Sequence, residues 1–484
     1  MHLTRKRTLL ATTATLMTVL SIGCGGSGGS KSSASTVAPS SSSTPTQTTS
    51  GTTAGATSGA LFDPAGQVAA ATSASAGVKA TLTTDAYVAF KESQSISDLV
   101  IPIDPALRDR AFVLEDKGSV RVLDLSGATP RIDHTLNLFA APLGNGATGK
   151  LNIQGANVAL AVTSGPASEG VAVFDPLNAT VPGDVVWFDL GGVTATFAAG
   201  TLDSQGMDVG GQALPMTYTS DAAISAGKLI FTSSNLQSNQ AYSPGTITAY
   251  DYDPQQNALS GGAFLVTSVM NPTGITRVQT AGGELLLVTN SGPYGAAEGS
   301  IDVVDPQGFR MLGTIHFPSF SNPGGQVTIS PDGKRGYVGS QSKAEVYVVD
   351  LEGLDSVIGA QGLDLSARFR GGFDLQSAAP ANFVCSVALS HSGNYLYAVS
   401  FNESALYVVD LVEGKTAARV AGFERSGSAA SYEGLANKIA VRQGVPGVDY
   451  SGPSIFAMTI NLAAADRKLQ DVSVALDTVS VDKH

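Results

Sequence analysis

The sequence has few of the residues on which disulfide, haem and transition-metal chemistry depend. Its 484 residues include two cysteines, one tryptophan and five histidines. Two cysteines, Cys24 and Cys385, are too few for a disulfide framework or a cysteine-based metal site, and the missing CxxCH motif excludes covalently attached c-type haem. His391 takes a turn position within a repeat, and no HxH or HExxH spacing joins the remaining pair, His134 and His316. We therefore expect no histidine metal site and no haem ligation.

Positive charge is also scarce. The chain has 28 Lys and Arg against 40 Asp and Glu, a formal net charge of −12, whereas nucleic-acid binding requires a basic surface. We therefore expect no nucleic-acid partner. Because neither a GxSxG nucleophile elbow between a strand and a helix nor a P-loop is present, we assign no catalytic residue, no cofactor and no metal ligand. Asp251 and Asp253 lack the spacing and closing Glu of an EF-hand, so a turn is favoured over a calcium site.

Glycine and apolar residues are plentiful. The chain has 55 glycines and 43% hydrophobic residues, while charged residues make up only 14%. This composition is typical of many short strands joined by turns and argues against a helical bundle.

The N-terminus predicts secretion and a lipid anchor. Residues 1–23 combine a basic start, Arg5 to Arg7, with an apolar stretch that is too short for a membrane span. The stretch ends LSIGC, which resembles a bacterial lipobox whose cysteine, Cys24, becomes the acylated N-terminus, as by palmitate. Ser21 departs from that pattern, which prefers Leu. The alternative is an ordinary signal peptide.

Residues 24–58 predict a flexible tether. After Cys24 the segment consists almost entirely of Gly, Ser, Thr, Ala and Pro, and Lys31 is its only charged residue. Such a segment cannot bury enough apolar surface to fold, and it would span about 30–35 Å on average. We therefore expect a body, residues 59–484, held outside the cytoplasm on a bacterial membrane, with the outer membrane or cell surface favoured.

A repeated unit dominates that body. Residues Val327–Leu351 read VTISPDGKRGYVGSQSKAEVYVVDL, and Val387–Leu411 read VALSHSGNYLYAVSFNESALYVVDL, without a gap between them when aligned. Each unit predicts three antiparallel strands separated by a Gly-containing turn and a polar loop.

The signature of the third strand recurs along the chain. It ends in an aspartate six times, at Asp124, Asp175, Asp251, Asp305, Asp350 and Asp410. A seventh unit, in which the repeat pattern is less regular, follows at the C-terminus. The stretch 78–90, in which apolar and polar residues alternate, is expected to complete it. Units of this length cannot bury their apolar faces alone, so radial stacking is favoured. We therefore predict an all-β, seven-bladed β-propeller of four-stranded antiparallel blades. Eight blades is the alternative, because residues 176–228 are long enough for another sheet.

The recurring aspartates have a structural interpretation. Asp favours the first position of a turn, where its carboxylate accepts backbone N–H groups. Asp332-Gly333 occupies such a turn between the first and second strands, and we expect a positive φ at Gly333.

The repeated SPDGKRGYV…VYVVDL unit is similar to the YVTN-type repeat of bacterial surface and periplasmic propellers. The distant relatives of that family include lactonase-like and nitrite-reductase-like propellers. The resemblance implies a propeller fold but says little of activity, since propellers host many functions.

Function is expected on the loops that interrupt the repeat. We assign these loops to the rim opposite the turns and select their aromatic and Arg residues as binding anchors. The candidates are Tyr242, Tyr294, Arg368, Arg370, Arg425 and Tyr432. The favoured function is an interaction module with a monomeric body that binds an envelope protein or polymer. The alternative is a lactonase-like extracytoplasmic hydrolase, and a partner of redox proteins is a weaker third hypothesis.

Overall fold

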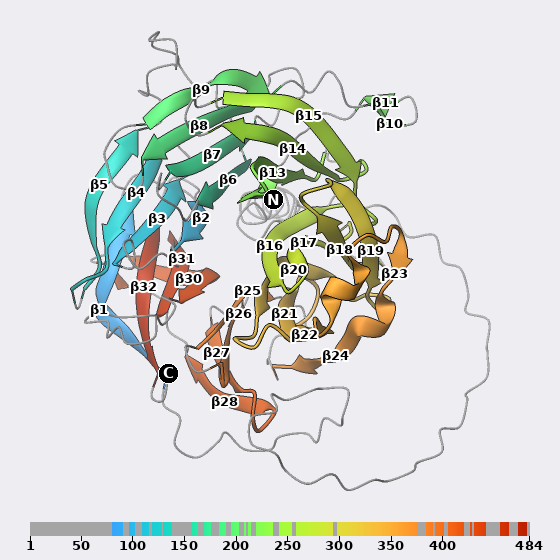
Figure 1. Cartoon of the computed structure of the whole chain (residues 1–484). Helices are drawn as coiled ribbons and strands as arrows, with labels where there is room; N and C mark the ends of the chain where they lie inside the picture. Colours follow the sequence, from blue (N-terminus) through green and yellow to red (C-terminus); the bar gives the residue numbers. More distant parts are fainter. Residues whose placement is uncertain are drawn as a thin grey trace, which may run out of the picture.

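The computed structural model describes the chain in segments that together form an all-β ring (Figure 1). The described residues are 80–90, 96–101, 109–115, 119–127, 129–137, 157–162, 169–175, 183–189, 195–202, 208–209, 212–213, 219–235, 242–253, 258–293, 298–375, 384–390, 393–400, 405–420, 426–427, 430–441, 455–463 and 473–481. The predicted signal peptide, Cys24 and the tether lie outside them.

Three sheets have four strands each. The first contains β2 (Ile96–Val100), β3 (Arg110–Glu115), β4 (Ser119–Asp124) and β5 (Arg131–Asn137). The second contains β20 (Pro323–Ile329), β21 (Arg335–Ser340), β22 (Glu345–Asp350) and β24 (Phe369–Asp374). The third contains β25 (Val384–Leu389), β26 (Tyr395–Ser400), β27 (Ala405–Asp410) and β28 (Lys415–Val420).

Two sheets have five strands. One contains β16 (Pro272–Thr280), β17 (Gly283–Asn290), β18 (Ser300–Asp305), β19 (Arg310–His316) and the short β23 (Leu363–Asp364). The other contains β29 (Ser426–Gly427), β30 (Ala430–Val441), β31 (Ile455–Ala463), β32 (Ser473–Val481) and β1 (Ala80–Phe90).

One sheet has eight strands. It contains β12 (Thr219–Ser225), β13 (Lys228–Ser233), β14 (Thr246–Asp253), β15 (Ala258–Val266), β9 (Ala195–Leu202), β8 (Gly183–Asp189), β7 (Glu169–Asp175) and β6 (Asn157–Val162), in that order. A two-stranded ribbon, β10 (Asp208–Val209) with β11 (Gln212–Ala213), and two 3₁₀ turns, η5 (Leu354–Val357) and η6 (Ser366–Arg368), complete the described elements.

The prediction of seven separate four-stranded blades is wrong. The described residues form five separate blades of four or five strands, and the rest of the ring is the continuous eight-stranded sheet. The merger has a local cause: β15 pairs in parallel with β9 through Ala258 and Ala199, and the two strands lie side by side in Figure 1. The alternative of an eighth blade within residues 176–228 also fails, because the described strands there extend this sheet or form the β10–β11 ribbon.

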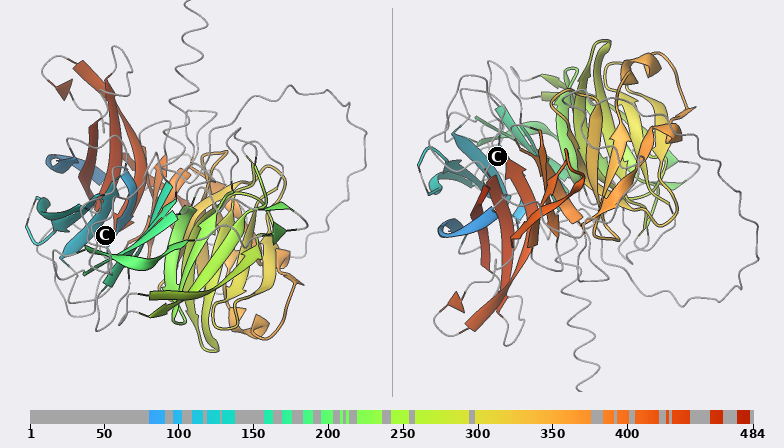
Figure 2. Two further views of the ribbon diagram at one scale, coloured as in Figure 1. Left: turned by 90° about the horizontal axis from the view of Figure 1, so that it is seen from above. Right: turned by 90° about the horizontal axis from the view of Figure 1, so that it is seen from below.

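The propeller assignment itself is supported by the arrangement of the innermost strands. Each innermost strand contacts the next one around the ring, and the last contacts the first. The order is β2, β6, β12, β16, β20, β25, β30 and back to β2. The predicted closure by the N-terminal strand is confirmed, because β1 pairs antiparallel with β32 along most of its length. Figure 2 shows the blue β1 beside the red C-terminal strands from both further sides.

The core lies between neighbouring blades. Successive side chains of a strand point to opposite faces, so each blade contributes to two clusters. In β22, Tyr347 and Val349 pack toward the preceding blade with Leu287 of β17. Val346 packs toward the following blade with Leu396 of β26. Both faces of the repeat are therefore apolar because both are buried.

The connections divide between two rims. The turn rim carries the first-to-second and third-to-fourth connections, including residues 281–282, 306–309, 330–334, 351–368 and 411–414. The long-loop rim carries the second-to-third and fourth-to-first connections, including the described residues 234–235, 242–245, 267–271, 291–293, 317–322 and 341–344. On the turn rim, Gly333 has φ 71° as predicted.

Candidate binding rim

Four of the six aspartates that close the third strands form structural turns. In four blades the carboxylate accepts the backbone N–H two residues later at 2.9–3.0 Å, which is the geometry of an Asx turn. The pairs are Asp124 with Ser126, Asp305 with Gln307, Asp350 with Glu352, and Asp410 with Val412. The structural interpretation is confirmed for these four aspartates.

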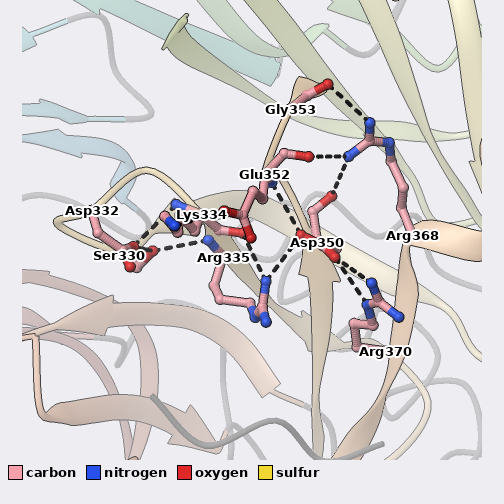
Figure 3. Close-up of polar contacts among 9 residues, drawn as sticks. All are labelled: Ser330, Asp332, Lys334, Arg335, Asp350, Glu352, Gly353, Arg368 and Arg370. Carbon is pink, nitrogen blue, oxygen red and sulfur yellow. Dashed lines mark hydrogen bonds and ion pairs between the residues drawn. The ribbon is translucent and has the colours of Figure 1, made fainter. Parts of the chain in front are cut away.

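Asp350 also joins three strands of its blade by charge (Figure 3). Arg335, at the start of β21, donates to Oδ1 at 2.9 Å, while Arg370 of β24 donates two hydrogen bonds to Oδ2. Burial alone would raise the pKa of Asp350. The hydrogen bonds from Arg370 and Glu352 and the two guanidinium charges outweigh it and lower the pKa. The carboxylate is therefore held ionised between strands β21, β22 and β24.

Arg368 has a different role from Arg370. Its guanidinium donates to three main-chain carbonyls, of Asp350 at 3.2 Å, Glu352 at 3.0 Å and Gly353 at 3.2 Å (Figure 3). These bonds fix the start of the connection between β22 and β24. Sequence reasoning predicts both arginines on the rim opposite the turns, in a loop from a fourth to a first strand, and that placement is wrong: β24 is the fourth strand, so both lie at the turn rim.

The connection that carries Arg368 crosses to the neighbouring blade. We call residues 351–368 the strap. Within it, β23 pairs in parallel with the outer edge of β19, Leu363 opposite Gly313. Ile358 packs so closely on Gly282 that a Cβ there would lie 2.7 Å from its Cδ1. The strap therefore covers part of the turn rim with the protein's own chain.

The remaining predicted anchors belong to the long-loop rim or lie outside the described residues. Tyr242 is half-buried in the connection between β13 and β14. Tyr294 and Arg425 lie outside the described residues. Tyr432 lies in strand β30, paired with Ala463, and only its backbone is described. Their binding role stays a prediction.

A repeated Asn-Pro pair organises the long-loop rim, and sequence reasoning missed it. Asn271-Pro272 and Asn322-Pro323 begin the first strands β16 and β20. Asn271 donates to the Ser291 hydroxyl at 2.7 Å, and Asn322 donates to the Ser291 carbonyl at 2.6 Å. These bonds join the fourth-to-first crossovers to the second-to-third loops. The signal was available in the sequence as NPTG and NPGG at the same place in two units.

Glycines leave room for these prolines. A Cβ on Gly245 or Gly299 would lie 2.5 Å from the Cδ of Pro272 or Pro323, respectively. Each glycine precedes the third strand of the blade before the proline. Close packing therefore fixes where each crossover lands on the next blade.

Two large apolar side chains stand exposed on these anchored crossovers. Met270 is 36% exposed and Phe320 is 59% exposed. Phe320 has φ 63°, a conformation that is costly for a bulky residue and that often marks a functional position. The hydroxyl of Ser342 donates to its carbonyl at 3.3 Å. The crossover therefore presents an apolar ring on a restrained backbone.

Two buried carboxylates were also missed. Asp221 of β12 accepts the N–H of Ile275 and the amide of Gln326, both at 2.8 Å, so it joins three successive innermost strands. Asp302 of β18 accepts from Ser268 and has no exposed surface. Asp221 lies outside the third-strand signature, and Asp302 lies within it at a position where two other units have Tyr347 and Tyr407, so only the three-dimensional arrangement reveals the role of either carboxylate.

The described residues contain no group of three or more His, Cys, Asp or Glu placed to hold a metal ion. Asp251 forms an ion pair with Lys228 of β13, and His316 is exposed at the end of β19. None of the helices in the described segments is long and apolar enough to cross a bilayer.

Comparison with known proteins adds little to this picture. No family model matches the sequence, and no curated protein matches it. The β-propeller domain of Cps50 (Swd1) from Myceliophteria thermophila is similar with a TM-score of 0.47 and 11% identity, over 81% of this chain and 100% of that one. A functionally unknown protein from Desulfotomaculum acetoxidans has a TM-score of 0.40 and 17% identity, over 68% and 86%. Both scores are too low to bear on function. The propeller assignment therefore depends on the sheets, and the YVTN-type repeat stays a prediction.

Proposed function

We propose that the chain is a membrane-tethered, extracytoplasmic propeller that binds an envelope protein or polymer through its long-loop rim. The observation that carries this proposal is the exposure of Met270 and Phe320 on crossovers anchored by the Asn-Pro hydrogen bonds. Aromatic and Met side chains are enriched at interfaces, and a restrained backbone reduces the conformational entropy that is lost on association.

The turn rim supports the same choice by contrast. Its arginines are engaged by Asp350 and by main-chain carbonyls, and the strap covers part of it. A partner docking there would have to displace contacts that already exist. The exposed side chains of Met270 and Phe320 lie on the other rim, away from these contacts.

The buried carboxylates give the hydrolase alternative no specific support. Asp221 binds a main-chain N–H and a side-chain amide of neighbouring blades, and Asp302 binds a main-chain N–H and two side-chain donors. These contacts suit groups that hold blades together. Lactone hydrolysis by the purified protein that is abolished in Asp221→Asn, with the fold intact, would overturn the binding-module proposal.

The rim can be tested by cross-linking and pull-down from intact cells. Phe320→Ala should remove the captured partner, while Val412→Ala should retain it. Val412 is a matched control, because it is an apolar residue with a similar exposure, 62%, on the opposite rim. Equal capture by both variants would contradict the assignment of the rim.

The proposed attachment to a membrane through Cys24 requires a separate test. Cys24→Ser should leave the protein in the soluble fraction and without labelled acyl chains, because the thiol is the proposed attachment point. Acylation of that variant would show that the anchor assignment is wrong. The two experiments are independent, since a released propeller retains its rim.

A further inference from the structure

A buried polar cluster lies where one fourth-to-first crossover meets the next blade. The crossover is Thr267–Asn271, which leads from β15 to β16 and carries the exposed Met270. At its centre lies Asp302 of β18, which has no exposed surface. The N–H of Ser268 donates to Asp302 Oδ2 at 2.9 Å, so the carboxylate binds the crossover directly.

Every hydrogen-bond partner of this carboxylate is neutral. Asn290 Nδ2 donates to Oδ2 at 2.9 Å, and the Thr314 hydroxyl donates to Oδ1 at 2.9 Å. Ser268 also reaches the hydroxyl of Ser300 at 2.7 Å. A buried carboxylate without a cation bears a large desolvation cost in its charged form.

The donors include the Ser268 hydroxyl as well, and they differ in whether they can reverse. Ser268 N–H and the Asn290 amide nitrogen can only donate, but a threonine hydroxyl donates or accepts. A proton on Asp302 Oδ1 could therefore be donated to Thr314 Oγ1 once that hydroxyl turns away. Oδ2 would keep both of its N–H donors. Protonation would remove the buried charge and lose no hydrogen bond.

We propose that Asp302 is a proton-binding lock, which holds the crossover Thr267–Asn271 more tightly when it is protonated than when it is ionised. The inference does not depend on the proposed function, because its readout is the docking of the crossover. The proposal implies that lowering the pH stabilises the docked position of this crossover on the long-loop rim.

The direction in which the pKa of Asp302 is shifted agrees with its burial among neutral donors. Burial raises the pKa of Asp302 above its usual 3.8, although the hydrogen bonds from Ser268, Asn290 and Thr314 oppose that shift. A carboxyl whose folded pKa is raised contributes its stability fully below the unfolded pKa. That stability is lost as the pH rises through the folded pKa.

Other ionisable groups near the cluster are few among the described residues. In register, Ser300 pairs with His316 and Asp302 pairs with Thr314, so His316 lies on the same face of its sheet. The blade packed against this face contributes apolar residues, including Ile230, Ile247 and Leu265. Asp364 of β23 pairs with Thr314 and therefore lies on the same face, and Arg277 and Glu284 lie farther along it. From the facing blade, Asp221 accepts the N–H of Ile275. Variants at His316 and Asp364, the two ionisable groups in register with the neighbours of Asp302, must therefore separate their charges from that of Asp302.

Hydrogen–deuterium exchange of a peptide spanning 267–271 in the full chain tests the lock. In the wild type, the protection factor, corrected for intrinsic exchange, should fall as the pH rises above 4. The fall should be up to about tenfold per pH unit until Asp302 is fully ionised. Asp302→Asn imitates the protonated group and should show a high, flat profile. His316→Gln and Asp364→Asn should each behave as the wild type.

Thr314 supplies a second arm in case Asp302→Asn does not fold. Thr314→Val removes the acceptor for the proton, so acidification should restore less protection than in the wild type. Thr314→Ser keeps the hydroxyl and should restore the wild-type profile. A protection factor independent of pH in the wild type, or a fall that persists in Asp302→Asn, would overturn the proposal.

Discussion

The close approach of two innermost strands makes Gly274 the sharpest test of the ring. Gly274 lies on β16, facing β20 of the next blade. A Cβ at this position would lie 2.3 Å from the carbonyl oxygen of Gly325 and 2.7 Å from the nitrogen of Gln326. Ordinary contact begins at 3.4 Å, so β20 would have to retreat by about 1 Å, as packed interiors do not absorb such overlap. We predict that Gly274→Ala is strongly destabilising.

The magnitude follows from what that retreat breaks. The N–H of Gly325 donates to the Thr273 hydroxyl at 3.2 Å, and the N–H of Val327 donates to the Thr276 hydroxyl at 2.8 Å. A shift of about 1 Å lengthens both beyond a hydrogen bond, which costs about 1 kcal/mol each. Overpacking adds about 1–3 kcal/mol. The free energy of unfolding of Gly274→Ala should therefore fall by about 3–5 kcal/mol.

Equilibrium denaturation in urea, followed by tyrosine fluorescence and far-ultraviolet circular dichroism, measures this change. Gly333→Ala is the matched control, because Gly333 has φ 71° but nothing within 4 Å of its Cβ position. It should lose only about 1 kcal/mol, the conformational cost of a left-handed alanine. If both variants lose the same small amount, the two innermost strands do not approach as described.

Three further predictions concern the blade of Figure 3. Asp350→Asn should destabilise the fold by about 1–3 kcal/mol at pH 7, since the two guanidinium groups lose the shared negative charge and one of its two acceptor oxygens is replaced by an NH2 donor. The folded pKa of Asp350 is lowered, so its contribution is present above about pH 4 and lost as the pH falls through the folded pKa. A pH-independent difference between the wild type and this variant would contradict that reasoning. Arg368→Ala should release the strap, seen as faster exchange of residues 351–368 with little change elsewhere; unchanged exchange would exclude the clamp. Tyr347→Phe should cost about 1 kcal/mol by removing the hydrogen bond from its hydroxyl to Ser340 at 3.0 Å, and ultraviolet titration of the wild type should show this phenol, whose pKa burial raises to about 12, ionising after the exposed tyrosines.

The units that sequence reasoning placed correctly are those in which local pattern and burial coincide. Tyr337 and Tyr397 hold equivalent positions in two repeats, and both are fully buried. The alternation of Tyr347 and Val348 sends one side chain to each neighbouring blade. A period of two, with both faces apolar, can be read from one sequence because each strand carries it independently.

The errors arise where pairing depends on residues far apart in the chain. The eight-stranded sheet exists because Ala258 meets Ala199, and nothing in either segment marks it as an edge that pairs in parallel. The strap pairs with β19 through the two-residue strand Leu363–Asp364. A strand that short has no periodicity, so Arg368 and Arg370 were assigned to the wrong connection and therefore to the wrong rim.

The two rims also differ in what repeats. On the turn rim, the same hydrogen bond from a closing aspartate to the backbone recurs in several blades. These residues therefore indicate the fold. On the long-loop rim the Asn-Pro anchor repeats while the exposed residue does not. Met270 directly precedes Asn271, whereas Phe320 lies two residues before Asn322. The residues that form the hydrogen bonds of the crossovers are therefore different from the residues whose side chains the crossovers expose. A change at Phe320 can alter recognition without altering the scaffold, whereas a change at Asn322 alters both.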